Sequence, residues 1–171
     1  DFRKNLREII SPDLKTTDRF KISMNFNNTL NNIVNTVINK EIQNINHFLN
    51  SVDENKLNNI VEEIINAPEL IIIGTRSSSP IAIYADYIFN RIGKKTKKII
   101  SGGTENFDFL STSDRNALVL AFGFARYPKE TIKILNFLRK RNYKIISITD
   151  NILSPLVKLS NDYLTIPCES I

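Results

Sequence analysis

Apolar residues recur at helical spacing in the first third of the chain. Between Phe26 and Leu49 they lie one, three or four positions apart, which predicts an amphipathic helix of about six turns. Ser51 precedes a second apolar stripe, and Glu54 follows three positions later, so we expect a capping box at the start of a second helix. Pro68 is expected to close that helix. The pattern therefore predicts two successive helices before residue 70.

From residue 70 onward, short apolar runs alternate with amphipathic stretches. Strands are predicted at Leu70–Ile73, Lys97–Ile100, Ala117–Phe122, Tyr143–Thr149 and Tyr163–Ile166. Helices are predicted at Pro80–Ile92, Glu105–Leu110, Pro128–Arg141 and, as a short turn, Pro155–Leu159. The strands are nearly all apolar, which is typical of a parallel sheet covered on both faces. We therefore expect an α/β fold, a three-layer sandwich with a five-stranded, mostly parallel sheet preceded by long helices.

The first 24 residues follow a different pattern. Phe2, Leu6 and Ile9 form a short helical stripe that ends at Pro12, and a polar stretch follows that we interpret as a linker. The chain does not start with Met, and it stops after "PCESI" without a capping or turn signal. We therefore expect a piece of a longer protein, truncated at the C-terminus as well, with one domain ending at residue 24 and another spanning 25–171.

Composition narrows the function classes only modestly. The net charge of +5 and the pI of about 9.3 fit an anionic partner, and they fit scattered surface lysines equally well. The single Cys168 excludes an internal disulfide and is interpreted as a small buried apolar residue, which suits a reducing cytoplasm. One His and one Cys cannot form a clustered metal site, and no apolar run is long enough to span a membrane. We predict no cofactor and a cytoplasmic location.

The stretch "GTRSSSPIA", residues 74–82, lies between a predicted strand and a predicted helix. Ser79 suits the N-cap of that helix and Pro80 its first turn. The helix start offers free N–H groups, and the hydroxyls of Ser77 and Ser78 add donors for an oxyanion. A phosphate site is one interpretation of this loop. The alternative, with even odds, is a capped helix with spare serines.

Several stretches, in order, resemble a known family. "LIIIGTRSSSPIAIYADYIFNRIGKK" looks like the first strand–loop–helix of a SIS (sugar isomerase) domain with a flavodoxin-like sheet, and "NALVLAFGFARYPKETIKILNFLRKRNYKIISITDNILSPLVKLSNDYLTIPCES" looks like its second half. "ARYPKET" and "ITDNILSPL" resemble the bacterial RpiR/MurR-type transcription regulators. The resemblance implies a C-terminal domain that senses a phosphosugar, with an N-terminal helix-turn-helix domain that would bind operator DNA. The DNA-reading helices would lie before residue 1.

The resemblance also implies site residues. Ser77 and Ser78 stand where the family's phosphate-contacting serines stand, within a candidate ligand set of Thr75, Arg76, Ser77, Ser78, Ser79, Ser101, Gly102, Gly123, Phe124, Ala125 and Arg126. The second loop departs from the family pattern Ser-x-Ser-Gly-x-Thr, because Gly123 and Ala125 replace its serines and Pro128 its threonine. Each lost hydrogen bond to a charged group costs about 1.5–3 kcal/mol. Backbone N–H groups, Arg76 or Arg126 would have to compensate, unless both arginines only pair with surface carboxylates. Weaker phosphate binding, another anion, or no ligand remain open.

Three functions are therefore compared. A phosphosugar-sensing, dimerising regulator domain without enzymatic activity is favoured, as a homodimer or higher oligomer. A sugar-phosphate isomerase is the alternative, and it needs a positioned general base. His47, on the predicted long helix, is better explained as a boundary or interface residue than as a catalyst. Glu169, after the last strand, is the one plausible base, and a solvated terminal residue is the preferred explanation for it. The third function is a structural dimer module that has lost its ligand, as Gly123 and Ala125 suggest.

Overall fold

The computed structural model describes residues 30–168, with side chains from residue 33 onward. The chain divides into two compact units, residues 1–47 with 168–171, and residues 48–167. The predicted helix at the N-terminus, the linker and the boundary at residue 24 lie outside the described residues. The helix α3 (Leu30–Ser51) corresponds to the predicted long helix and carries most of what is described of the first unit. The candidate site belongs to the second unit.

Helix α3 presents a stripe of exposed apolar side chains. Six of them have more than a third of their surface exposed: Val34, Val37, Ile38, Ile42, Ile45 and Leu49. They recur at three- and four-residue spacing, as the apolar pattern predicts for one side of a helix. An exposed apolar stripe of this length is typical of a surface that contacts another protein.

The start of the next helix differs from the sequence prediction. Helix α4 spans Glu54–Asn66, and its N-cap is Asp53, whose carboxylate accepts a hydrogen bond from the Lys56 N–H at 3.1 Å. Ser51 is the last residue of α3, and its hydroxyl donates back to the Phe48 carbonyl. The predicted Ser51–Glu54 capping box is therefore wrong. Asp53 caps the helix in place of the serine, because its side chain accepts a hydrogen bond from a free N–H and an acidic residue interacts favourably with the positive end of the helix dipole.

The sheet has five parallel strands. They are β1 (Leu70–Ile73), β2 (Thr96–Ile99), β3 (Leu118–Gly123), β4 (Lys144–Thr149) and β5 (Asp162–Thr165), in the spatial order β2-β1-β3-β4-β5. The register pairs Ile73 with Ile99 on one side and with Ala121 on the other. After β2 the chain crosses back over β1, and β3 pairs with the other edge of β1. The direction in which strands are added to the sheet therefore reverses at β1. In sheets of this kind ligands bind at the carboxyl ends of the strands beside such a switch point.

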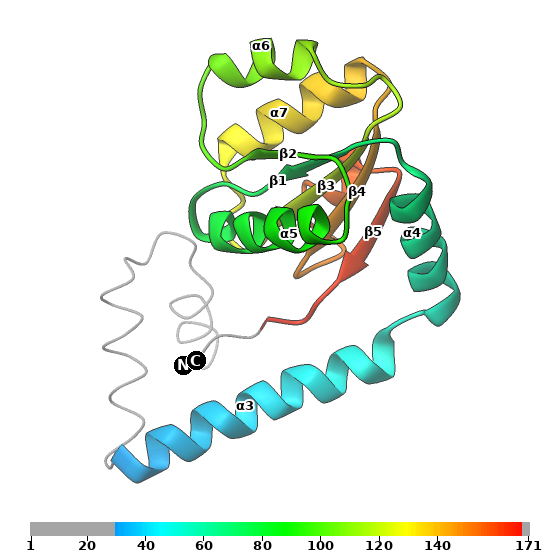
Figure 1. The fold of residues 1–171 in the computed structure, drawn as a ribbon. Coiled ribbons are helices and arrows are strands. Elements are labelled where there is room, and N and C mark those ends of the chain that lie inside the picture. Colours follow the sequence, from blue (N-terminus) through cyan, green and yellow to red (C-terminus); the bar gives the residue numbers. More distant parts are fainter. Residues whose placement is uncertain (1–29, 169–171) are drawn as a thin grey trace. The chain divides into compact units, whose positions relative to one another are not determined.

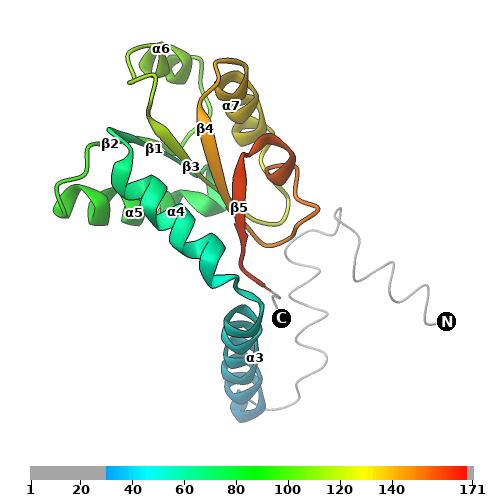
Figure 2. The same cartoon turned by 90° about the vertical axis from the view of Figure 1, so that its right-hand side faces the viewer.

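Helices cover both faces of this sheet, which confirms the predicted sandwich (Figure 1). They are α5 (Ser79–Arg91), α6 (Glu105–Ser111) and α7 (Lys129–Lys140), together with α4. Ile71 and Ile73 face the layer of α6 and α7, whereas Leu70 and Ile72 face α4 and α5, which lie on the side of the sheet opposite to α7 (Figure 2). Alternate residues of β1 therefore point to opposite faces, and both faces are buried.

From residue 70 onward, the predicted strands and the three longer predicted helices are found with shifts of at most one residue at their ends. The long helix α3 ends two residues later than predicted, and its predicted start at residues 26–29 lies outside the described residues. The exception after residue 70 is Pro155–Leu159, of which only Val157–Leu159 is helical, as a short 3-10 turn. Leu156, just before that turn, is fully buried in the core formed with α6 and α7. This segment thus packs on the sheet through Leu156 and the partly buried Leu159 without forming an α-helix.

The interface between α5 and β2 contains a buried carboxylate. Asp86 accepts hydrogen bonds from Lys98, Thr96 and Asn90. Burial raises the pKa of Asp86, but the hydrogen bonds from Lys98 and Thr96 and the charge of Lys98 outweigh it and hold that pKa below its ordinary 3.8. The charged form therefore ties the edge strand to α5.

Replacing Asp86 by Asn is expected to lower the free energy of unfolding by about 1–3 kcal/mol near neutral pH, because charge-assisted hydrogen bonds are lost. A depressed folded-state pKa contributes stability above the unfolded-state value, and this contribution is lost as pH falls through the folded-state value. The difference between wild type and Asp86→Asn should therefore shrink as pH falls below 3.8. Urea unfolding over that pH range measures it, and a constant difference would contradict the assignment.

Candidate functional site

The first loop after β1 is anchored by a pair of threonines. Thr75 is buried, and its hydroxyl lies 2.8 Å from the hydroxyl of Thr131 on α7. Gly74 allows α5 to approach, because a Cβ there would lie 2.6 Å from the Ser78 carbonyl oxygen. Arg76 follows with a φ of 54°, a left-handed backbone that arginine rarely adopts. The loop is thus held in one conformation by packing on both sides.

The serines of this loop lie at the start of α5. Ser78 is the N-cap and Ser79 the first helical residue, one position earlier than the sequence prediction placed the cap, and Pro80 follows in the first turn. The Ser78 side chain makes no capping hydrogen bond to the helix. Ser78 is buried, Ser79 is half-buried and Ser77 is exposed. A capping serine should accept a hydrogen bond from an N–H of the first turn. Because Ser78 accepts none, the structure does not support the interpretation that the serines only cap the helix.

The second loop follows β3, and the packing around Gly123 disfavours the serine that the family pattern has at this position. A Cβ added at Gly123 would lie 2.4 Å from Cδ2 of the buried Leu156. A serine at that position would have to displace a core side chain, which costs about 1–3 kcal/mol. The glycine at position 123 is therefore explained by the close packing of Leu156. The loop presents backbone groups there, where the family pattern has a serine hydroxyl.

Asp150, directly after β4, binds the second loop. Its carboxylate accepts hydrogen bonds from the Ala125 N–H at 3.1 Å and from the Tyr127 hydroxyl at 2.7 Å. Burial raises the pKa of Tyr127, and its hydrogen bond to the charged Asp150 raises it further. Arg126, between the two, is exposed and has a φ of 71°. One of the predicted backbone donors, Ala125, is thus bound to an internal carboxylate, and the turn at Arg126 is strained.

A third segment, after β2, contacts the start of α7. Ser101 and Gly102 are exposed, and Asn106 holds their turn by donating to the Ser101 carbonyl at 2.8 Å. A Cβ at Gly102 would lie 2.6 Å from Cγ of Glu130. Glu130 in turn accepts a hydrogen bond from Arg76 at 3.1 Å. The segments after β1 and β2 and the start of α7 therefore meet at the carboxyl ends of the strands.

Most of the residues predicted for the site lie around these strand ends. Thr75, Arg76 and Gly102 are joined through Thr131 and Glu130 of α7, whereas Ala125 is held by Asp150. Sequence reasoning missed Glu130 and Asp150. Both carried a signal, because Glu130 is an acidic residue in the first turn of a predicted helix and Asp150 follows directly on a strand.

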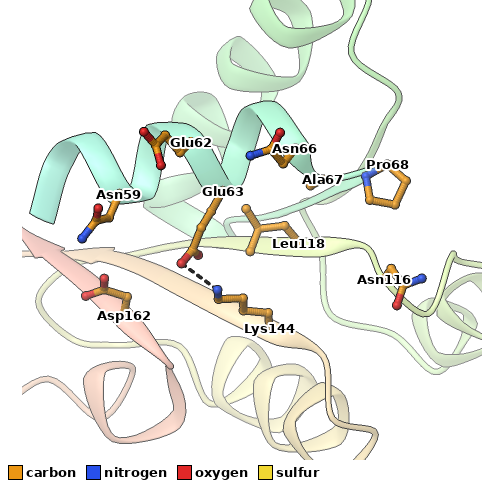
Figure 3. Close-up of a pocket in the computed structure, with 10 residues that line it drawn as sticks. All are labelled: Asn59, Glu62, Glu63, Asn66, Ala67, Pro68, Asn116, Leu118, Lys144 and Asp162. Atoms are coloured by element: carbon orange, nitrogen blue, oxygen red, sulfur yellow. Dashed lines mark ion pairs between the residues drawn. The ribbon is translucent and has the colours of Figure 1, made fainter.

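The structure also contains a pocket of about 520 Å³ at the opposite edge of the sheet. Figure 3 shows its lining, which comes from α4 and from the amino-terminal ends of the strands: Asn59, Glu62, Glu63, Asn66, Ala67, Pro68, Asn116, Leu118, Lys144 and Asp162. Glu63 and Lys144 form an ion pair across it at 2.6 Å. This pair fastens α4 to β4. None of the predicted site residues lines this pocket.

The sequence also singles out Cys168, His47 and Glu169. Cys168 is exposed, so its interpretation as a buried apolar residue is wrong. His47 is exposed on α3, and Glu169 lies outside the described residues. Within residues 30–168, no group of three or more His, Cys, Asp or Glu side chains is placed to hold a metal ion. The helices described there also include none with the length and apolar character needed to cross a membrane.

Comparison with known families identifies this arrangement. Residues 63–170 match the model of the SIS domain. The chain belongs to the SIS domain family. The chain is 26% identical over 165 residues to an uncharacterised HTH-type transcriptional regulator of Clostridium perfringens. The match covers 96% of this chain and 58% of that regulator, so the chain spans little more than half of its relative's length.

Solved structures confirm the fold of the SIS domain. The sugar isomerase domain of an RpiR transcription factor from Sphaerobacter thermophilus has a TM-score of 0.75 at 23% identity, covering 80% of this chain and 76% of that one. The Vibrio vulnificus NanR protein, complexed with ManNAc-6P, has a TM-score of 0.69 at 23% identity, covering 95% and 61%. A Methanococcus jannaschii protein for which a 3-hexulose-6-phosphate isomerase function was inferred has a TM-score of 0.61 at 17% identity, covering 80% and 73%. Regulators and isomerases thus share this fold.

Proposed function

We propose that this SIS domain is the effector-sensing and dimerising part of an RpiR-type transcription regulator, and that its effector is a phosphosugar. The observation that carries the proposal is the start of α5, where the N-cap Ser78 makes no capping bond. The positive end of the helix dipole lies at this loop, the hydroxyls of Ser77 and Ser78 stand beside it, and the N–H groups of the first turn beyond Ser79, whose own N–H bonds to the Arg76 carbonyl, would add donors. Such a set of donors suits a phosphate.

The sugar part of the effector would lie toward the segment after β2. Ser101 is exposed there, and Gly102 brings the backbone close to Glu130. Hydroxyl groups of a sugar can donate to carboxylate and carbonyl oxygens and accept from N–H groups, and both kinds are present at this strand end. The second loop would contribute the backbone near Phe124, with Arg126 as an added charge. The ManNAc-6P of the NanR complex supports a phosphosugar as the class of effector.

The dimerising role is supported by α3. Its exposed apolar stripe, from Val34 to Leu49, suits a second copy of the chain, because burying such surface is favourable by about 25 cal/mol per Å². Effector binding would shift the arrangement of two subunits and so the DNA-binding domains expected before residue 1. Such coupling is reciprocal, so operator DNA would change the affinity for the effector by the same factor.

A panel of phosphosugars tests the proposed function. At 100 times its dissociation constant, a bound phosphosugar should stabilise the domain by about 2.7 kcal/mol, which a thermal-shift assay detects. The matching sugars without phosphate serve as controls and should give no shift. The same samples should show no turnover of fructose 6-phosphate or glucosamine 6-phosphate. Turnover would favour the isomerase, and silence from every phosphosugar would favour a structural module.

A further inference from the structure

The exposed rim of the candidate site contains an ion pair between segments far apart in the sequence. Arg76 Nη2 lies 3.1 Å from Glu130 Oε1, with 72% of the Arg76 side chain and 37% of the Glu130 side chain exposed. Arg76 belongs to the loop that carries Ser77 and Ser78, and Glu130 to the first turn of α7. The arginine that stands beside the proposed phosphate site is therefore already bound to a carboxylate of the protein itself.

The position of Glu130 is fixed by its surroundings. Its Cγ lies only 2.6 Å from where a Cβ of residue 102 would stand, so the Glu130 side chain packs closely against the backbone of Gly102. The next residue, Thr131, is fully buried and bonded to Thr75, which holds this turn of α7 against the first loop. The carboxylate therefore cannot leave the site by a shift of the helix. It can leave only by turning its side chain.

The carboxylate is charged but incompletely satisfied. A hydrogen bond from its own backbone N–H lowers the pKa of Glu130, and the hydrogen bond from Arg76 lowers it further. Oε2 is nevertheless buried without a hydrogen-bond partner. Arg76 reaches the pair from a left-handed backbone. The unsatisfied Oε2 disfavours the present position of the Glu130 carboxylate, so a competing anion at Arg76 would release it from a costly arrangement.

We propose that Glu130 sets the affinity for the effector: it occupies Arg76 in the absence of effector and competes with the effector's phosphate for that guanidinium. This inference rests on the proposed phosphosugar function. A phosphate dianion offers Arg76 two parallel hydrogen bonds and more charge than one carboxylate, so it displaces Glu130. A neutral sugar brings no charge to replace Glu130 and leaves the pair intact. The pair therefore lowers the affinity for phosphorylated sugars and leaves the affinity for their neutral counterparts unchanged.

The test compares affinities of wild type and Glu130→Gln for a phosphosugar found in the panel, by calorimetric titration. Glu130→Gln keeps the shape and removes the competing charge, so binding should tighten about two- to fivefold, as expected for a partly exposed ion pair. Glu105→Gln, at the start of α6, is the matched control for the change in net charge and should leave the affinity within about 1.5-fold of wild type. In an Arg76→Ala background, Glu130→Gln should no longer tighten binding, because the guanidinium for which the carboxylate and the phosphate compete is gone.

The outcomes separate this inference from the proposed function. Unchanged affinity in Glu130→Gln, or an equal gain in Glu105→Gln, rejects the competition and leaves the phosphosugar site standing. Weaker binding in Glu130→Gln also rejects it, because the carboxylate would then contact the sugar. A gain that persists in the Arg76→Ala background rejects the role of Arg76. If neither wild type nor any variant binds a phosphosugar, the proposed function fails, and the inference fails with it.

Discussion

Replacing Ser77 and Ser78 together by alanine is expected to weaken phosphosugar binding by about 10²- to 10⁴-fold. Each hydrogen bond to a charged group contributes about 1.5–3 kcal/mol, and two are removed. The free energy of unfolding should change little, because Ser78 makes no capping bond and Ser77 is exposed. Calorimetric titration measures the affinity, and urea unfolding measures the stability.

The matched control for this double variant is Ser51→Ala with Ser111→Ala. Both serines are exposed and lie at the ends of α3 and α6, where their hydroxyls donate to carbonyls of the same helix. This pair should bind the phosphosugar as wild type does. If the variant at positions 77 and 78 also binds normally, the serines are not phosphate ligands. A large loss of stability in that variant would restore the interpretation of these serines as helix caps.

Gly74→Ala is expected to have the second large effect, on stability and on binding together. The new Cβ would lie 2.6 Å from the Ser78 carbonyl oxygen and 2.9 Å from the Ala82 Cβ, so α5 must move away from β1. Overpacking of this kind costs about 1–3 kcal/mol and should lower the melting temperature by about 3–10 °C. Because the start of α5 carries the proposed phosphate donors, the same shift should weaken phosphosugar binding.

Gly103→Ala is the control for this substitution. Its Cβ would meet only the carboxylate of Glu105, the far end of a flexible side chain that can turn away. Gly103 lies in the segment after β2, at the same edge of the sheet as Gly74. The control should therefore cost less than about 0.5 kcal/mol. Equal losses in the two variants would contradict the claim that the α5 contact at Gly74 positions the site.

Much of the fold could be predicted from local pattern. The apolar run Leu70–Ile73 has no polar position on either face, and the structure buries all four residues completely. Such a strand requires a layer on each side, which is why the sandwich could be predicted. The cap of α4 could not, because Ser51 and Asp53 are both good N-cap residues. The structure extends α3 through Ser51 and gives the cap to Asp53.

The site was predicted less completely than the fold. The loop at Ser77 and Ser78 could be located because a strand, a polar turn and a helix follow one another in the sequence. The contacts of Glu130 with Arg76 and of Asp150 with Ala125 join residues 54 and 25 positions apart. No local pattern encodes such pairs, since they depend on how neighbouring parallel strands bring their following loops together. The packing of Leu156 on Gly123 is hidden for the same reason.

A crystal structure of this SIS domain with a bound phosphosugar tests the central claim most directly. Phosphate density is expected at the start of α5, within hydrogen-bond distance of the Ser77 and Ser78 hydroxyls, with the sugar toward Ser101. Arg76 is expected to turn from Glu130 to the phosphate. Density confined to the pocket lined by Glu63 and Lys144 at the opposite edge, or a phosphate that contacts neither serine, would contradict the account.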